Sequence, residues 1–309
     1  MDGAYTQVAQ ALPARAWPSL RPRRRAWLGG LQGSEYAWAV AFVVPYAGVF
    51  LAFVAYPVLY GLWLGHAPSL YAELLEDPIY RRTVVNTVLY VGIGVNLKMF
   101  LALLLSGFFM RRGWWVKGLL LIYVLPWAVP ALPVFISIHW MLNGQWGLLN
   151  NFLWEVFGID GPGWIETSRW LALASVIVSH IWKWLPFWTV ILLAGRMAIP
   201  QELYDAAEVD GATGLRRFMH LTFPLLANLY LICTLLSTIF TLGDFNTVFF
   251  VSGGGPALST HVLATLGIRN AFEVARPELG VAAVMSALPL MIPLIIILMR
   301  KLRTTEVQL

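Results

Sequence analysis

The sequence contains little charge and almost no cysteine, and these two shortages exclude several classes of protein. Of its 309 residues, 12% are charged, about half the share in an ordinary soluble domain. The single cysteine, Cys233, rules out an internal disulfide and a cysteine-based metal cluster, so we expect it to be a small apolar filler. The five histidines are scattered over different segments, which argues against a membrane-embedded enzyme with a clustered catalytic centre.

Patterns for nucleotide chemistry and for repeat folds are also missing. No GxxxxGK[ST] phosphate loop occurs, although such a loop is what holds the phosphates in many ATPases. Any nucleotide must therefore be handled by a partner, and we predict no catalytic residue, metal or cofactor in this chain. No period of about 20 to 50 residues is visible, which argues against a repeat architecture.

Apolar residues are abundant, at 59% of the chain. A helix needs around 20 of them to cross a hydrocarbon core about 30 Å thick, and six runs are long enough. Their approximate bounds are 36–64, 83–110, 114–142, 170–195, 225–251 and 279–299. Prolines inside several runs indicate kinked helices. We therefore predict an all-α membrane protein with a six-helix domain over residues 35–300, a flexible N-terminal tail over residues 1–34 and a C-terminal tail over residues 301–309.

The distribution of basic residues predicts the orientation of these runs, because positively charged loops stay on the cytoplasmic side. One set of alternating segments holds fourteen of them and the opposite set holds five. The larger set comprises Arg15, Arg21, Arg23, Arg24, Arg25, Arg111, Arg112, Lys117, Arg196, Arg216, Arg217, Arg300, Lys301 and Arg303. Both termini should therefore be cytoplasmic, with the first run as an uncleaved anchor. The net charge of +5 then reflects topology and not nucleic-acid binding.

A polar segment, "ELYDAAEVDGATGLRRFMHLTFP" at residues 202–224, interrupts the apolar runs and should also be cytoplasmic. Pro200 suits the first turn of a helix, and Gly211 suits the left-handed position just after its end. Thr213 can cap a second short helix that Pro224 would stop. Residues 200–224, which we call the coupling loop, should therefore form a helix, a tight turn and a helix.

Side chains on the first of these helices suit contact with another protein. Glu202, Asp205 and Glu208 recur every three residues and share part of one face. The small side chains of Ala206 and Ala207 permit close approach by a partner's backbone. An ordinary solvated loop with caps is the alternative that these residues alone leave open.

The coupling loop resembles the cytoplasmic EAA loop of ATP-binding-cassette (ABC) importer permeases. The positions that match are Asp205, Ala206, Ala207, Asp210, Gly211, Ala212, Phe218 and Pro224. Asp205 stands where that family most often has Glu. The stretches "YRRTVVNTVLYVG", "WKWLPFWTVILLAGRMAIPQELYDAAEVDGA" and "FNTVFFVSGGGPALSTHVL" resemble the maltose-type, sugar-importing branch. The resemblance covers roughly residues 25–300 and implies a type I ABC importer permease fold.

This resemblance also implies several partners. In the family, the EAA loop seats in a cleft of a dimeric ABC ATPase that binds ATP and Mg, and an extracytoplasmic binding protein delivers the solute. We accordingly expect a second permease subunit that forms a heterodimer with this chain, a sugar substrate, surrounding lipid and a place in the cytoplasmic membrane of a bacterium. A polyamine or other small charged solute, and a passive channel, are the alternatives.

Polar residues inside two of the runs indicate where a solute could bind, because such residues tend to face the bundle interior or a wet cavity. Ser237, Thr241 and Asp244 fall on one helical stripe of the fifth run, and His180, Lys183, Trp184 and Phe187 fall on one stripe of the fourth. Proteins bind sugars through hydrogen bonds to their hydroxyls and through aromatic rings that cover their apolar faces, and these two stripes offer both.

The family resemblance places the sugar site at the same positions and adds two on the third run. These are Trp127, which lies between two prolines, and Ala131, one turn further on. Packing roles for His180 and the tryptophans, and a structural ion pair between Lys183 and Asp244, are the alternatives. Lys98, on the second run, is assigned no role in the site.

Overall fold

A computed structural model of the chain describes residues 33–306, where all regular structure is helical. The chain divides into two compact units, residues 1–57 and 58–309, which are described separately. The first contains α1 (Gly33–Phe50), a π-helical turn (Leu51–Ala55) and the start of α2 (Tyr56–Leu64). The predicted N-terminal tail lies almost wholly outside the described residues.

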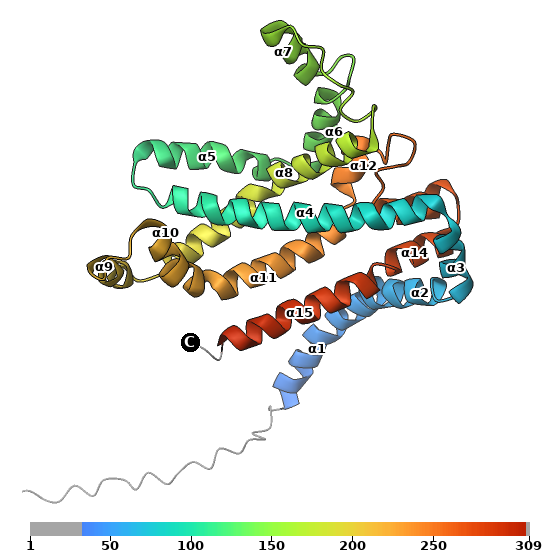
Figure 1. Cartoon of the computed structure of the whole chain (residues 1–309). Helices are drawn as coiled ribbons and strands as arrows, with labels where there is room; N and C mark the ends of the chain where they lie inside the picture. Colours follow the sequence, from blue (N-terminus) through green and yellow to red (C-terminus); the bar gives the residue numbers. More distant parts are fainter. Residues whose placement is uncertain (1–32, 307–309) are drawn as a thin grey trace, which may run out of the picture. The chain divides into compact units, whose positions relative to one another are not determined.

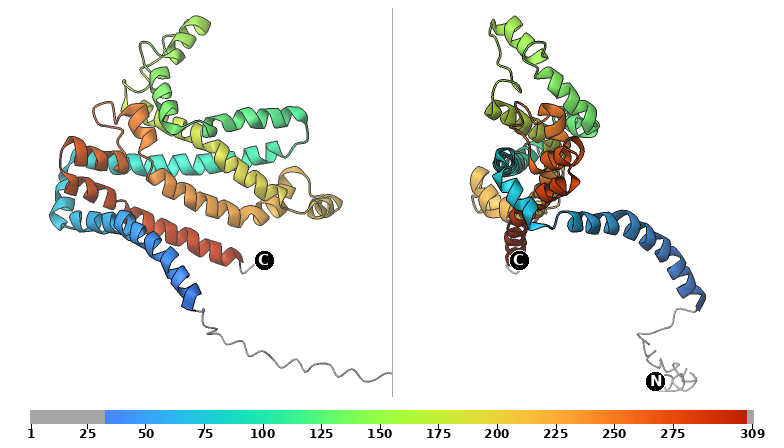
Figure 2. Two further views of the ribbon diagram at one scale, coloured as in Figure 1. Left: turned by 180° about the vertical axis from the view of Figure 1, so that it is seen from behind. Right: turned by 90° about the vertical axis from the view of Figure 1, so that its right-hand side faces the viewer.

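The second unit is built around α4, α8 and α11, which lie side by side in opposite views (Figures 1 and 2). Its helices are α3 (Pro68–Glu76), α4 (Pro78–Phe109), α5 (Trp114–Ala128), α6 (Ala131–Met141), α7 (Leu148–Phe157), α8 (Arg169–Met197), α9 (Gln201–Val209), α10 (Gly214–Arg217), α11 (Phe223–Leu242), α12 (Asn246–Ser252), α13 (Leu263–Ile268), α14 (Pro277–Met285) and α15 (Leu288–Glu306). Met99, Trp188 and Leu226 from the three central helices share one core cluster. Cys233 is buried there as a free thiol, as expected for a filler.

Four helical stretches among the described residues are long and apolar enough to cross a membrane. They are Ala37–Leu64, Pro78–Phe109, Arg169–Met197 and Gly214–Leu242. The third predicted run becomes α5 and α6, which are bent by 94° and make a fifth span if the pair counts as one. The sixth predicted run is divided between α14 and α15. The nine-residue α14 is too short to span, and the last third of α15 contains Arg300, Lys301 and Arg303, so six spans are not confirmed.

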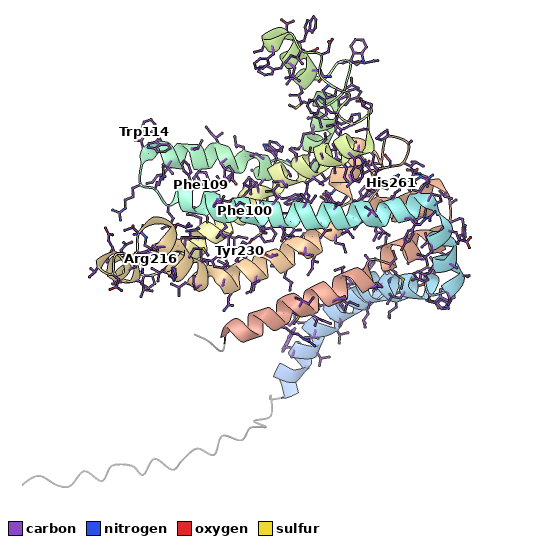
Figure 3. The ribbon with its side chains drawn as sticks, in the orientation of Figure 1. Phe100, Phe109, Trp114, Arg216, Tyr230 and His261 are labelled. Atoms are coloured by element: carbon purple, nitrogen blue, oxygen red, sulfur yellow. The ribbon has the colours of Figure 1, made fainter. Side chains whose placement is uncertain are left out.

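The two predicted classes of loop lie at opposite ends of the second unit. The connections from α4 to α5 and from α8 to α11 meet at one end (Figure 1). They hold four members of the larger basic set, Arg111, Arg112, Arg216 and Arg217. The start of α4, the start of α8 and the segment after α12 meet at the other. Figure 3 shows this separation through its labels, with Trp114 and Arg216 at one end and His261 at the other. Which of the two ends faces the cytoplasm stays a prediction.

Prolines explain two of the π-helical turns. In the turn at Phe218–Thr222 the N–H of Phe223 donates to the carbonyl of Phe218, and Pro224 follows directly. The turn at Leu51–Ala55 closes on Tyr56 in the same way, one residue before Pro57. A proline lacks the N–H and its ring clashes with the carbonyl four residues back, and the wider turn relieves both problems. The prediction that Pro224 stops a helix is therefore wrong, because Gly214–Leu242 is one helical stretch.

The coupling loop has the helix, turn, helix arrangement at its start. Pro200 precedes α9 as its capping residue, one position earlier than expected, and α9 ends at Val209. Gly211 then adopts a positive φ of 71°, the left-handed conformation that glycine accepts without steric cost. Thr213 is extended and caps α10, although its side chain makes no capping hydrogen bond. The second helix of the prediction is α10, and it runs on into α11.

Candidate functional site

A cavity of about 530 Å³ lies between α4, α5, α8 and the end of α11. Its floor and walls combine ring faces with a few polar groups. The lining residues are Lys98, Trp127, His180, Trp184, Phe187, Trp188, Ile239, Phe240, Thr241, Gly243, Asp244, Phe245 and Asn246. A volume of this size is typical of a site for a small solute.

Aromatic rings form one side of the cavity. Trp127 at the end of α5 stacks on Phe187 of α8, with 5.5 Å between ring centroids and 28° between ring planes. Phe187 in turn meets Trp188 edge to face at 4.9 Å. Because successive contacts fix each ring, the wall presents broad apolar faces in defined orientations.

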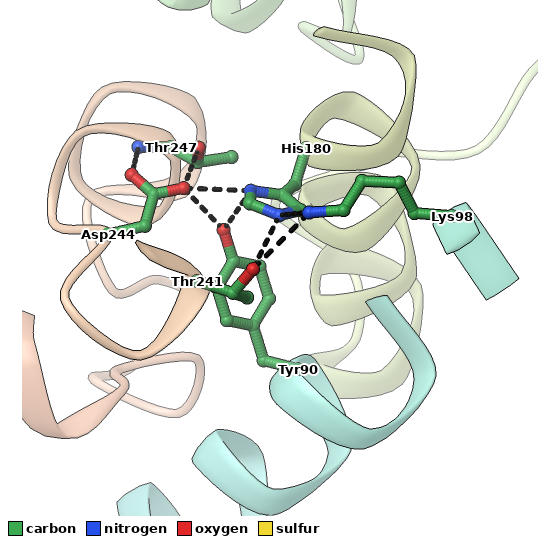
Figure 4. A network of polar contacts seen from close by, with 6 residues as sticks. All are labelled: Tyr90, Lys98, His180, Thr241, Asp244 and Thr247. Carbon is green, nitrogen blue, oxygen red and sulfur yellow. Dashed lines mark hydrogen bonds and ion pairs between the residues drawn. The ribbon is translucent and has the colours of Figure 1, made fainter. Parts of the chain in front are cut away.

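A buried polar network centred on His180 forms the other side (Figure 4). The ammonium of Lys98 lies 2.9 Å from His180 Nε2 and 3.3 Å from the hydroxyl of Thr241. At the other ring nitrogen, His180 Nδ1 lies 2.8 Å from Asp244 Oδ2. An ammonium can only donate, so Nε2 accepts from Lys98, and Nδ1 carries the ring proton that is donated to Asp244.

Asp244 lies just beyond the end of α11 and is held from several directions. The hydroxyl of Tyr90 donates to its Oδ2 at 2.7 Å, and the backbone N–H of Thr247 donates to its Oδ1 at 3.1 Å. The Thr247 hydroxyl also donates to Oδ2. The carboxylate is therefore largely satisfied within the protein, and its charge is balanced by the nearby Lys98.

The structure brings six of the nine predicted site residues around this cavity. They are Trp127, His180, Trp184, Phe187, Thr241 and Asp244. Ala131 packs against a separate core cluster, and Ser237 is fully buried with no hydrogen-bond partner for its hydroxyl. Lys183 points to backbone carbonyls of α5, and its ammonium is not paired with Asp244. Substrate binding by any of the nine stays a prediction.

Sequence reasoning left out several residues that complete the site. Lys98 was assigned no role, yet it lines the cavity and is only 1% exposed. A lysine in the middle of a spanning helix was the available signal, since such charges are costly and usually functional. Tyr90 gave no comparable signal, because only the packing of α4 against α8 and α11 brings it to Asp244. Thr247 lies three residues after Asp244, and its contacts with that carboxylate are local ones that the sequence reasoning did not consider.

The coupling loop is a second candidate surface at the far end of the second unit from His261 (Figure 3). No residue of α9 is buried. Apolar side chains are exposed beside its acids, with Val209 at 89% and Leu215 at 75% exposure. A Cβ added to Gly211 would meet nothing within 4 Å. The loop thus presents small, apolar and acidic groups outward and keeps Phe218 partly covered.

The glycine-rich segment at residues 253–262 is fixed at the opposite end by α4. The side-chain amide of Asn86 donates to the carbonyls of Ser259 and His261, at 2.8 and 2.9 Å. Arg169, at the start of α8, donates twice to the carbonyl oxygen of that same Asn86 side chain. One buried asparagine therefore links α4, α8 and this segment.

Across the described range, no three His, Cys, Asp or Glu side chains gather where they could hold a metal ion. Lys98, His180 and Asp244 are titratable residues that line the cavity, and each is already engaged by protein groups. The arrangement suits recognition of a solute through hydrogen bonds and ring contacts more than covalent chemistry.

Comparison with known proteins identifies the family. The family described as "Binding-protein-dependent transport system inner membrane component" matches residues 98–302. The sulfoquinovosyl glycerol transport system permease protein SmoG of Agrobacterium fabrum is 35% identical over 197 residues, which cover 63% of this chain and 62% of that protein. The trehalose/maltose transport system permease protein MalF of Thermococcus litoralis is 30% identical over 240 residues, covering 72% and 80%. The chain therefore spans just under two thirds of the first relative's length.

A solved structure has the same fold. A chain of a bacterial alginate ABC transporter, crystallised with an alginate pentasaccharide-bound periplasmic protein, superposes with a TM-score of 0.75 over 85% of this chain and 93% of its own length, at 21% identity. This chain therefore belongs to the family of binding-protein-dependent transport system inner membrane components. It is a permease, as the resemblance of its coupling loop indicated. Its relatives include sugar-transport permeases, as the resemblance of the other stretches indicated.

Proposed function

We propose that this chain is the membrane-spanning subunit of an ABC importer for a sugar or a sugar-like solute. An external binding protein would deliver the solute, and a separate ATPase dimer, which binds ATP and Mg, would drive transport. A second, different permease subunit would complete the pathway. The coupling loop, both termini and the larger basic set would face the cytoplasm of a bacterium, and the chain would cross the membrane six times with α14 and α15 as the last span.

The cavity is the single observation that carries the choice of solute. The stacked rings of Trp127 and Phe187 offer the apolar faces that cover a pyranose ring, and Lys98 and Thr241 offer a donor and a hydroxyl within the same 530 Å³ space. Sugars present hydroxyls around their edge and C–H groups on their faces, so they match both kinds of wall. The named solutes of the two relatives, sulfoquinovosyl glycerol and trehalose/maltose, are of the same chemical class.

The same cavity disfavours a polyamine. A polycation needs free carboxylates, but Asp244 already accepts from Tyr90, His180 and Thr247. Lys98 also lines the cavity and offsets the charge of Asp244, so no net negative charge is left to attract a polycation. A sugar suits the site better because it needs no countercharge.

Coupling to an ATPase is supported by the exposure of the coupling loop. A partner can shift the permease between outward-open and inward-open states only by binding those states with different affinity. The exposed face of α9, with Val209 beside the small Ala206, suits such a partner because apolar groups lie uncovered next to acids. A passive channel would not need this surface.

A pair of glycine substitutions tests this function. Gly211 and Gly158 both have positive φ, 71° and 64°, and an added Cβ meets nothing within 4 Å at either position. Asparagine tolerates this conformation better than most residues. We expect Gly211→Asn to abolish ATP-dependent uptake while membrane abundance is retained, because the new side chain protrudes only into the partner's space. Gly158→Asn, at the end of α7, is the matched control and should transport normally.

The solute itself is best identified through the binding protein. A panel of mono- and oligosaccharides is screened for a shift in the melting temperature of the purified binding protein, and the sugar that it retains becomes the uptake substrate. Normal uptake of that sugar by the Gly211→Asn protein would refute coupling through this loop. Retention of a polyamine and no sugar by the binding protein would instead refute the assignment of substrate class.

A further inference from the structure

Lys183 is a buried lysine whose ammonium faces the break between α5 and α6. The side chain is only 1% exposed. Its Nζ donates to the carbonyl of Pro126 at 2.6 Å and to that of Trp127 at 3.4 Å, and it also donates to the carbonyl of Val129. All three donors of the ammonium are therefore directed at one short stretch of backbone.

Two of those carbonyls are the ones that prolines leave without a partner. In an unbroken helix the carbonyl of Pro126 would accept from residue 130 and the carbonyl of Val129 from residue 133. Both of these residues are prolines and have no N–H to give. Lys183, from another helix, supplies the missing donors. A buried carbonyl without a partner is costly, so this lysine removes a penalty that the break would otherwise carry.

The charge of Lys183 is also accounted for at this position. The ion pairs found between described residues do not include Lys183, and the carboxylate of Asp244 is occupied by other groups. The carbonyls at the C-terminal end of α5 carry the negative end of the helix dipole, which favours a cation there. Backbone dipoles of α5 thus take the place of a counterion.

The face of α8 that carries Lys183 also contacts the ring of Trp127, the residue after Pro126. Phe187 lies four residues after Lys183, so the two side chains share a face of α8. Phe187 stacks on Trp127, whose ring borders the cavity. One turn of α8 thus contacts the end of α5 in two ways. Lys183 donates to its backbone carbonyls, and Phe187 stacks on its Trp127 ring.

We propose that Lys183 is a positioning residue that fixes the 94° bend between α5 and α6 and thereby sets the Trp127 ring in the cavity wall. It acts through the backbone of α5 and not by touching the solute, which differs from its expected role as a substrate ligand. The consequence for solute recognition rests on the proposed function, whereas the role of Lys183 in the bend does not. The role of Lys183 and the proposed function can therefore be refuted separately.

Spin-label distances across the bend test the proposal without any solute. In a Cys233→Ala background, labels are placed at Leu121 of α5 and Trp140 of α6, whose side chains are both well exposed. The full chain in lipid nanodiscs is measured by pulsed electron paramagnetic resonance. We expect one narrow distance distribution with Lys183 and a broader one with a shifted mean for Lys183→Met, which keeps the length and loses every donor.

Three controls separate positioning from general damage. Lys183→Arg retains donors and charge and should restore the narrow distribution. Lys117→Met removes an exposed lysine of the same α5 helix and should change nothing. A second label pair, at Phe100 of α4 and Val178 of α8, reports on the core and should be unaffected by Lys183→Met.

Each outcome decides the proposal. A change confined to the α5 and α6 pair, with rescue by arginine, supports it. An unchanged distribution in Lys183→Met overturns it, and so does an equal change in the α4 and α8 pair, because the lysine would then be a general packing residue. If Lys183→Met does not reach the membrane, Lys183→Gln, which keeps two amide donors on a shorter chain, should give an intermediate width. A distribution in that variant identical to wild type would also overturn the proposal.

Discussion

His180 Nδ1 lies 2.8 Å from Asp244 Oδ2, although 64 residues separate them in the chain. The contact joins α8 to the end of α11, and Lys98 on the opposite side of the ring adds α4 to the same network. Three helices that line the cavity thus meet at one imidazole. A cation, a bridging ring and an anion follow one another, so the network is close to neutral as a unit.

The balance of charge in this network can be tested by removing the charges of Asp244 and Lys98, first separately and then together. Asp244→Asn leaves the buried Lys98 without compensation and should lower the free energy of unfolding by about 3 kcal/mol, as expected when one partner of a buried pair is lost. The double variant with Lys98→Met should lose less than the sum of the single losses. Thermal unfolding in detergent measures all four proteins, and simple additivity would show that the two charges do not interact.

Trp184 and Trp182 lie on different sides of α8 and provide a matched pair. Trp184 lines the cavity, whereas Trp182 borders an apolar groove with Leu149 and Trp164. We expect Trp184→Ala to raise the half-saturation concentration for uptake by roughly 10-fold, the upper range for loss of one aromatic contact. Trp182→Ala should leave that concentration unchanged. Membrane abundance is checked by immunoblot, and equal uptake by both variants would move the site away from this cavity.

His261 should make stability depend on pH between about 6.5 and 4, its ordinary and folded pKa values. Burial and then the positive charge of Arg269 lower the pKa of His261 to about 4. In that window the unfolded chain binds a proton that the folded chain does not, so stability is complete above pH 6.5 and falls as the pH is lowered. The total loss is about 3 kcal/mol. His261→Gln should flatten a series of unfolding measurements from pH 7 to 5, and an unchanged slope would contradict this origin.

Two neighbouring glycines separate a steric effect from a conformational one. Gly253 and Gly254 both have positive φ, 59° and 81°. A Cβ on Gly254 would lie 2.3 Å from the ring of His261, whereas on Gly253 its nearest contact is at 3.8 Å. Both alanine variants should therefore lose about 1 kcal/mol from the backbone, and Gly254→Ala should lose clearly more. Equal melting temperatures would mean that the His261 ring moves aside freely.

The helical period was enough to predict much of the cavity. His180, Trp184 and Phe187 share a face of α8, and the 3.6-residue repeat places them together without knowledge of any other helix. Thr241 and Asp244 were found in the same way, although α11 ends at Leu242 and Asp244 reaches the site from the connection that follows. Regular geometry within one segment is what a single sequence encodes most directly.

Contacts between segments were harder to predict, and so were interruptions of helices. Nothing local in the sequence says that Tyr90 and Lys98 of α4 meet His180 of α8, since packing decides that. The direction of Lys183 depends on carbonyls that only a broken α5 exposes. Continuity through Pro224 depends on a widened turn that the proline rule alone does not foresee.

Continuity through Pro224 has a mechanical consequence. The stretch Gly214–Leu242 has 29 residues and is therefore about 43 Å long at a rise of 1.5 Å per residue. It begins beside the exposed tip at Gly211 and ends next to the hydroxyl of Thr241 in the cavity wall. When a rigid rod of that length tilts by one degree about its Gly214 end, its other end moves by about 0.75 Å. The widened turn at Phe218–Thr222 lies near the Gly214 end of this stretch.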